Sequence, residues 1–207
     1  MTNQDLMRWA QEVQALAQSG MAYTTNVFDQ GRYQELRHIA AQMMASAADA
    51  ELTEVTAVFD AQSGYATPKL DVRGVIFKDE KILLVRELMD GGAWTLPGGW
   101  IDINESLSQA AEREVREEAG MIVKAKKLAA VYDRNRHGHP PYPFHALKLF
   151  VICDLIAEAT PDPTETSEPT FFAKDTLPNL SRARVTEEEI LRMFVHLHSP
   201  DLPTDFD

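Results

Sequence analysis

The sequence predicts an α+β fold preceded by a small all-helical domain. Apolar residues in the stretch 1–62 recur at three- and four-residue steps, which is typical of amphipathic helices. Two β-rich runs follow at 69–86 and 122–156, and helical patterns at 106–119 and 187–198 separate and close them. Strands, one helix, more strands and a terminal helix are typical of an α+β or α/β/α domain.

The helical domain is predicted to span residues 1–64, and the second domain is predicted to span residues 65–207. Acidic residues outnumber basic ones in the helical part, which argues against a DNA-binding helix pair. Its apolar faces are expected to pack on the second domain or on a second subunit. A homodimer is the arrangement that we favour.

Three helices are expected in the first domain. The first is expected to end at Ser19-Gly20. The second is expected from about Gln30 to Ala48, with Asp29 as its N-cap. A shorter third helix is expected from about Leu52 to Gln62.

The second domain is expected to begin with a hairpin and to end with a helix. β-branched and aromatic residues, bounded by turn residues, indicate its strands. The expected strands are Lys69–Phe77, Lys81–Arg86, Trp94–Leu96, Ile122–Tyr132, Phe144–Ile156 and a last short one at Thr170–Ala173, and the closing helix is Glu187–His198.

The stretch Trp94–Val123 is the part around which the rest of the chain is organised. The turn Pro97–Gly99 cannot continue a strand and predicts a tight loop. Asn104 is the expected N-cap of a helix over Ser106–Ala119, which contains neither proline nor glycine. Gly120 fits the left-handed position that ends a helix.

Three carboxylates on this helix predict a cation site. Glu114, Glu117 and Glu118 share one edge of the helix, where like charges repel. A divalent cation relieves this repulsion, and hard oxygen ligands suit Mg²⁺ or Mn²⁺ better than Zn²⁺. Arg113 could hold the Glu117 carboxylate in place. Taken alone, such a cluster also fits an ordinary solvated helix with ion pairs.

The full pattern is more specific than the cluster. From Gly99 to Met121 the chain reads G-x5-E-x7-R-E-U-x-E-E-x-G-U, where U is apolar, and every specified position is filled. This pattern resembles the Nudix box, the signature of enzymes that hydrolyse a nucleoside diphosphate linked to another moiety. The resemblance implies a Nudix α/β/α sandwich with a mixed β-sheet.

The resemblance also implies roles for individual residues and a metal cofactor. It makes Glu114, Glu117 and Glu118 the ligands of Mg²⁺ or Mn²⁺, with the carbonyl of Gly98 as an addition. Arg113 would orient a carboxylate, and Glu105 would support the geometry between loop and helix. The general base is either a box glutamate or a carboxylate of a later loop, for which the candidates are Glu165 and Glu168. A solvated acidic loop is the alternative interpretation of the latter two.

The helical start, followed by GYATPKLDVRGVIF, resembles a Nudix subgroup with a small helical N-terminal domain. Members of that subgroup act on CDP-choline, UDP-sugars or ADP-ribose. We therefore expect hydrolysis of NDP-X to NMP and phospho-X, with CDP-choline or NDP-sugars first and ADP-ribose next. The alternatives are hydrolysis of nucleoside triphosphates or of RNA 5′ ends, a ligand sensor that does not cut, and a helical dimer module with a vestigial site. The complete box and the acidic helical domain disfavour the last two.

Cations and aromatic residues indicate where the substrate would bind. The loop Asp133–Pro143 could meet a phosphate and a base, and two arginines of the first strands could face the site. A surface loop with incidental histidines is the competing interpretation, and a zinc site of His137, His139 and His145 lacks the expected cysteines. The candidates are Arg73, Arg86, Arg134, Arg136, His137 and Tyr142.

Composition restricts the partners and the compartment. The chain has 207 residues and a net charge of −12, which opposes DNA binding and favours bringing a cation to a phosphate substrate. Its only cysteine is Cys153, so an internal disulfide is excluded and a reducing cytoplasm is expected. The start of the chain does not read as a secretory signal, and neither a membrane span nor a membrane partner is expected.

Overall fold

The computed structural model describes residues 2–158 and 166–207, and the chain divides into two compact units. The helical unit comprises Met1–Lys69 together with Pro140–His145, and the sheet unit comprises Leu70–His139 and Ala146–Asp207. The segment Pro140–His145 is far from the helices in sequence, and its place among them was not expected.

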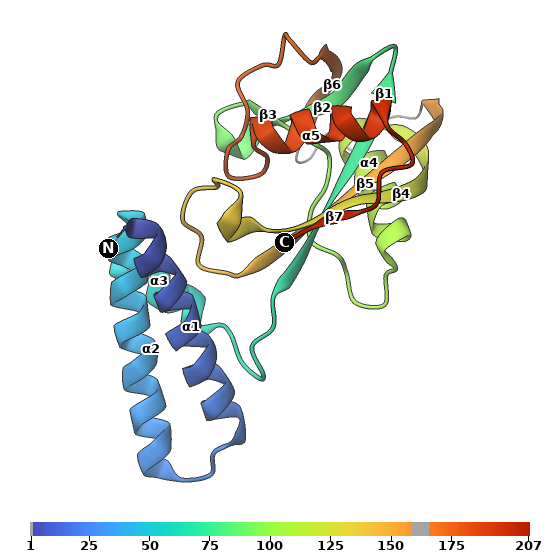
Figure 1. Ribbon diagram of the computed structural model, residues 1–207. Coiled ribbons are helices and arrows are strands. Elements are labelled where there is room, and N and C mark those ends of the chain that lie inside the picture. The colour runs from blue at the N-terminus through green and yellow to red at the C-terminus, as the bar shows by residue number, and fades with distance from the viewer. Residues whose placement is uncertain (1, 159–165) are drawn as a thin grey trace. The chain divides into compact units, whose positions relative to one another are not determined.

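The helical unit consists of α1 (Asn3–Tyr23), α2 (Val27–Ala48) and α3 (Leu52–Asp60) (Figure 1). The prediction that the first helix ends at Ser19-Gly20 is wrong, because α1 continues through Gly20. A Cβ atom at Gly20 would lie 2.4 Å from the ring of Tyr33 on α2. This glycine therefore permits close packing of two helices instead of ending one.

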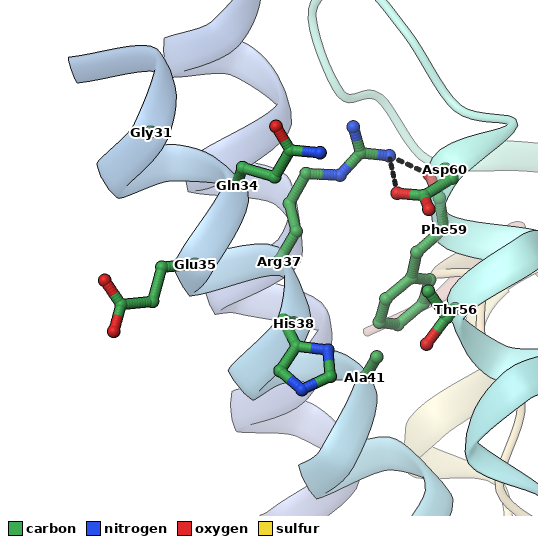
Figure 2. A pocket seen from close by; sticks show the side chains of 9 residues that line it. All are labelled: Gly31, Gln34, Glu35, Arg37, His38, Ala41, Thr56, Phe59 and Asp60. Atoms are coloured by element: carbon green, nitrogen blue, oxygen red, sulfur yellow. Dashed lines mark hydrogen bonds and ion pairs between the residues drawn. The ribbon is translucent and has the colours of Figure 1, made fainter. Parts of the chain in front are cut away.

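Side chains at the helix ends supply partners for backbone groups that lack them. The predicted cap Asp29 lies inside α2, and Asn26 caps this helix by accepting a hydrogen bond of 2.9 Å from the N–H of Phe28. At the end of α3, Arg37 donates to the carbonyl oxygen of Phe59 and pairs with Asp60 at 3.5 Å (Figure 2). It also donates to the carbonyl oxygen of Gln62. Arg37 thereby ties α2 to the last turn of α3.

Among the described residues, the sheet unit is built on one mixed seven-stranded sheet. Its strand order is β3-β2-β1-β5-β4-β7, and β6 pairs with β2. β4 and β7 are parallel, whereas the pairs β1–β2, β2–β3, β2–β6 and β4–β5 are antiparallel. The strands are β1 (Lys69–Lys78), β2 (Lys81–Glu87), β3 (Ala93–Thr95), β4 (Met121–Asp133), β5 (Ala146–Glu158), β6 (Thr166–Ala173) and β7 (Asp205–Phe206), with short 3-10 turns η1 (Leu88–Asp90) and η2 (Arg134–Arg136). The expected last strand is therefore longer than predicted, and β7 follows it.

Helices α4 (Leu107–Ala119) and α5 (Glu187–His198) cover opposite faces of this sheet (Figure 1). Alternate residues of β2 enter the two cores: Leu83 faces the α4 side, and Ile82 faces the α5 side. This alternation follows from the two-residue period of a strand. It confirms the α/β/α sandwich that the family resemblance implies.

The end of α4 agrees with the sequence, but its start does not. Gly120 has φ 60° and ends the helix in the left-handed conformation, as predicted. The predicted cap Asn104 lies in the preceding loop with φ 68°, and Ser106 caps the helix by accepting from the N–H of Gln109. Within the parts of the chain that the structure describes, no helix is both long and apolar enough to cross a bilayer.

Candidate active site

The loop before α4 is attached to the backbone of β1. The N–H groups of Val72 and Gly74 donate to the carbonyl oxygens of Gly99 (2.9 Å) and Pro97 (2.8 Å). Gly98 has φ 149°, and a Cβ atom there would lie 2.0 Å from the carbonyl oxygen of Val72. Only glycine permits this close approach of the loop to the backbone of β1.

Arg113 organises the carboxylates at this edge of α4. Its guanidinium donates two hydrogen bonds to Glu105, of 2.8 and 2.9 Å, in a bidentate arrangement. Its Nη1 also donates to Glu114 (2.8 Å) and Glu117 (3.2 Å). The hydrogen bond to Arg113 is the main reason why the pKa of Glu105 lies below its usual range. This arrangement is consistent with the orienting role expected of Arg113 and the supporting role expected of Glu105.

Glu118 connects the helix to the glycine loop. Its Oε2 accepts a hydrogen bond of 2.9 Å from the N–H of Gly98. The pKa of Glu118 is raised to about 7, mainly by burial and also by the nearby carboxylates of Glu114 and Glu87, against the opposing effect of Arg73 and the Gly98 N–H. Burial therefore favours the protonated form of Glu118 more strongly than in an exposed glutamate.

The donor set at this edge fits a hard divalent cation. Burial also raises the pKa of Glu114, so a cation next to Glu114 and Glu118 would relieve an unfavourable concentration of negative charge. Among the described residues no three acidic, histidine or cysteine side chains are already grouped for metal binding. One carboxylate oxygen of Glu114 and one of Glu117 accept hydrogen bonds from Arg113.

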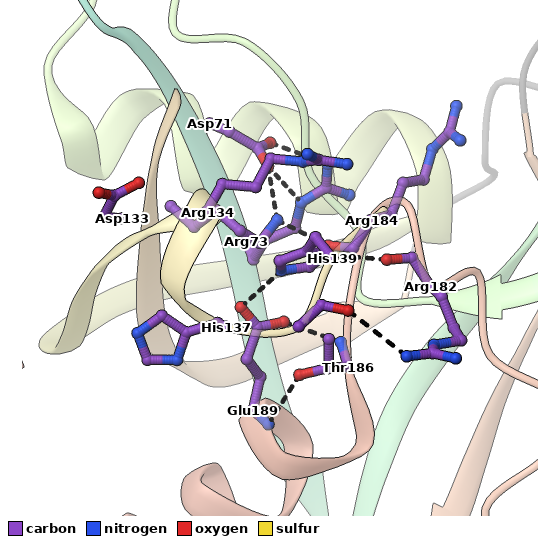
Figure 3. Close-up of polar contacts among 12 residues, drawn as sticks. Asp71, Arg73, Asp133, Arg134, His137, His139, Arg182, Arg184, Thr186 and Glu189 are labelled. Atoms are coloured by element: carbon purple, nitrogen blue, oxygen red, sulfur yellow. Dashed lines mark hydrogen bonds and ion pairs between the residues drawn. The ribbon is translucent and has the colours of Figure 1, made fainter. Parts of the chain in front are cut away.

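Beneath the loop lies a buried ion-pair network that the sequence did not indicate (Figure 3). Asp71 binds Arg73 through contacts of 2.8 and 3.3 Å and accepts a hydrogen bond of 2.7 Å from Lys148. Burial opposes its ionisation, but Arg73 and Lys148 outweigh that effect and hold the pKa of Asp71 below its usual range. Arg73 Nη1 also donates to the carbonyl oxygen of Leu96 (3.2 Å), directly before the glycine loop.

A second buried pair joins the loop Asp133–Pro143 to α5. His139 contacts Glu189 (2.9 Å) and the carbonyl oxygen of Arg182 (2.8 Å), and the side chains of His139 and Glu189 are fully buried (Figure 3). The alternative zinc site does not form among the described residues, since His137 instead contacts Asp207. These buried contacts favour a structural role for His139.

Several of the predicted substrate ligands are engaged within the protein. Arg73 is 6% exposed and Arg134 is 4% exposed, and Arg134 donates to the carbonyl oxygen of Ala183. This burial favours structural roles for both arginines. His137 stacks on the ring of Tyr132 at 4.0 Å between ring centroids.

The other candidates lie in different surroundings. Arg86 is exposed and donates to the carbonyl oxygen of Gly92 (3.1 Å), and Arg136 is exposed beside Asp133 at 3.5 Å. Tyr142 belongs to the helical unit, whereas the other substrate-ligand candidates of the loop Asp133–Pro143 belong to the sheet unit. The candidates of this loop are therefore divided between the two units. Glu165 lies outside the described residues, and of Glu168 only the backbone is described, within β6.

Comparison with known proteins agrees with this architecture. Residues 67–194 match the NUDIX domain, and residues 4–59 match the UDP-X-like, N-terminal oligomerisation domain of Nudix proteins. The chain is 39% identical over 198 residues to the Bacillus subtilis (strain 168) protein named "Putative ADP-ribose pyrophosphatase YjhB", covering 96% of this chain and 95% of that protein.

Two solved structures are also similar. A UDP-X diphosphatase is 34% identical, covers the whole of both chains and has a TM-score of 0.63. An ADP-ribose pyrophosphatase from Streptococcus suis is 38% identical and has a TM-score of 0.62, with 68% of this chain and all of that chain covered. With the complete box and the matching sandwich, these findings show that the chain belongs to the Nudix hydrolase family and is a diphosphatase.

Proposed function

We propose that the chain hydrolyses the diphosphate bond of a nucleoside diphosphate linked to another moiety, releasing NMP and phospho-X. The observation that carries this proposal is the edge of α4, where Glu114, Glu117 and Glu118 lie beside a glycine loop attached to β1. Water attacks one phosphorus, the bond to the bridging oxygen breaks, and a carboxylate accepts the proton of the water.

Nudix hydrolases generally require a divalent metal, and we infer Mg²⁺ or Mn²⁺ for this chain. The carboxylates of Glu114, Glu117 and Glu118, with the carbonyl of Gly98, would hold it, because all are hard oxygen donors. When bound, such an ion neutralises phosphoryl charge and acidifies water. Arg113 keeps the carboxylates oriented through its four hydrogen bonds to Glu105, Glu114 and Glu117.

The general base and the substrate ligands are proposed from the remaining candidates. A box glutamate or one of Glu165 and Glu168 serves as the base. Arg86 and Arg136 are the exposed cations among the predicted ligands, and either can pair with a phosphate. Arg73 we assign to positioning, because it is buried between Asp71 and the backbone of the loop.

The names of the relatives rank the substrates. ADP-ribose comes first, since two similar proteins are named as ADP-ribose pyrophosphatases. UDP-linked compounds come second, since a third is named as a UDP-X diphosphatase. CDP-choline and related NDP-alcohols follow as further candidate substrates. The expected products from ADP-ribose are AMP and ribose 5-phosphate.

A hydrolysis screen tests this proposal. Purified protein is offered ADP-ribose, UDP-sugars, CDP-choline, nucleoside triphosphates and capped RNA with Mg²⁺, Mn²⁺ or EDTA, and products are identified by mass. Metal-dependent release of NMP from one NDP-X class is the expected result. Turnover of triphosphates or capped RNA alone would replace the substrate class, and binding without any turnover would indicate a sensor.

We propose a homodimer formed through the helical unit, whose family match is an oligomerisation domain. Large apolar side chains cluster where α1 and α2 meet: Tyr23 is 75% exposed, Val27 70% and Phe28 74%. Burial of such side chains against a second copy is favourable.

Light scattering tests the dimer. Replacing Val27 and Phe28 by aspartate places two charges on this surface and should convert dimers into monomers. Aspartate at exposed Gln30 and Gln34 of the same helix is the matched control and should leave the dimer intact. A dimer that persists in the first variant would place the interface elsewhere.

A further inference from the structure

The helical unit contains an open cavity of about 260 Å³ beside three glutamines of α1. Gln11, Gln14 and Gln18 follow the three- and four-residue spacing of one helix face, and none is more than 9% exposed. All residues that line the cavity belong to the helical unit, and none belongs to the glycine loop or to α4. The cavity and the carboxylate site of the sheet unit therefore share no residue.

The two outer glutamines bind backbone carbonyl groups. Gln11 Nε2 donates to the carbonyl oxygen of Tyr142 (2.8 Å). Gln18 Nε2 donates to those of Ser63 (3.2 Å) and Gly64 (3.1 Å). These two side chains thus hold the segments that form the walls of the cavity on either side.

Gln14, between them, has no such partner. It is 6% exposed, and neither its amide nitrogen nor its carbonyl oxygen makes a hydrogen bond. Buried amide groups are almost always paired, because an unpaired one loses its hydration without compensation. The side chain lines the cavity, so a ligand or an ordered water there would supply the missing partners.

The walls of the cavity favour a flat ring. Phe59, Tyr65 and Phe144 contribute aromatic side chains, and Lys69 Nζ lies 4.8 Å from the centroid of the Phe144 ring. Aromatic side chains stack on planar heterocycles. The volume lies just below the range of ~300–1,000 Å³ that is typical of drug-sized ligands, which suits one ring system.

We propose that this cavity binds an adenine base, presented by adenosine or AMP. A glutamine amide matches the adjacent donor and acceptor of adenine with two hydrogen bonds, and Gln14 provides that amide. Neighbouring side chains cover the amide, so binding requires the Gln14 side chain to change rotamer and to point its amide into the cavity. Lys69 supplies positive charge for the phosphate of AMP. The proposal holds whether or not the sheet unit cleaves ADP-ribose.

Calorimetric titration of the full-length protein with adenosine and AMP tests the site. Gln14→Met keeps the shape of the side chain but removes both hydrogen bonds, and Ala15→Leu fills the cavity from the same helix. Each should weaken adenosine binding at least tenfold, which corresponds to ~1.4 kcal/mol. Gln14→Met should also melt at a higher temperature, because it removes an unpaired buried amide.

Two controls locate the binding. Gln30→Met makes the same replacement at an exposed position of α2, and Glu118→Gln alters the carboxylate site. Both should bind adenosine as the unaltered protein does. Equal affinity in the Gln14 and Ala15 variants would overturn the proposal, and so would the absence of adenosine binding at millimolar concentration, which would leave water as the occupant.

Discussion

Glu118→Gln should reduce turnover of the preferred NDP-X substrate by at least ~100-fold, because loss of even an outer-shell partner of a metal ligand typically costs 10–100-fold. The amide oxygen of glutamine can still accept the hydrogen bond from Gly98, so the loop should stay in place. The melting temperature should remain nearly unchanged. Steady-state kinetics with Mg²⁺ and a thermal melt of the same preparation measure both quantities, and normal turnover would remove Glu118 from the site.

Glu118→Gln should also change how the metal-free stability and the affinity for Mg²⁺ depend on pH. The pKa of Glu118 is raised to about 7, above its usual value of 4.5, so its contribution to metal-free stability is present below pH 4.5 and is lost as pH rises through 7. A bound metal must displace this proton, so the apparent affinity for Mg²⁺ should rise between pH 6 and 8. The Glu118→Gln protein should lose both dependences. Glu112→Gln, on the same helix and paired with Lys124, is the matched control and should keep them.

Asp71→Ala should destabilise the protein by about 3–5 kcal/mol, the typical result of removing one partner from a buried ion pair. Arg73 and Lys148 would be left as buried cations, since their side chains are only 7% and 0% exposed. Arg73 would also lose the carboxylate that orients it toward Leu96, directly before the glycine loop. Turnover should therefore fall together with stability.

Urea unfolding measures this change, with the m-value as a check that the transition stays two-state. Asp102→Ala removes an exposed carboxylate from the neighbouring loop and should change stability by less than about 0.5 kcal/mol. Adding Lys148→Met to Asp71→Ala removes one of the stranded cations and should recover part of the loss. A loss below 1 kcal/mol in the single variant would show that the network contributes little.

Much of the fold could be predicted from the sequence because its signals are local. The closing helix begins and ends at the predicted residues, since Thr186 caps it by accepting from the N–H of Glu189 and apolar residues recur along one face. The left-handed end of α4 at Gly120 is equally local. The box required only the identity and spacing of residues within one stretch, and the family followed from it.

Other features depended on the tertiary structure. Lys148 lies in a β-rich run, and only the packing of its strand near β1 brings its ammonium to Asp71. Gly20 reads as a helix end until the ring of Tyr33 is seen to occupy the space of a side chain. Tyr142 and Arg134 are neighbours in one loop, yet they belong to different units.

The sequence by itself determined that the helices exist, where α5 begins and ends, and the family, because periodicity and motif spacing act over a few residues, although it misplaced the end of α1 and the caps of α2 and α4. Only the tertiary structure decided that Arg113 joins Glu105 to the box carboxylates and that Arg73 is buried in an ion pair. It alone showed that Gln14 lacks a partner beside a cavity. Contacts between residues far apart in the chain depend on strand register and packing, which no local pattern encodes.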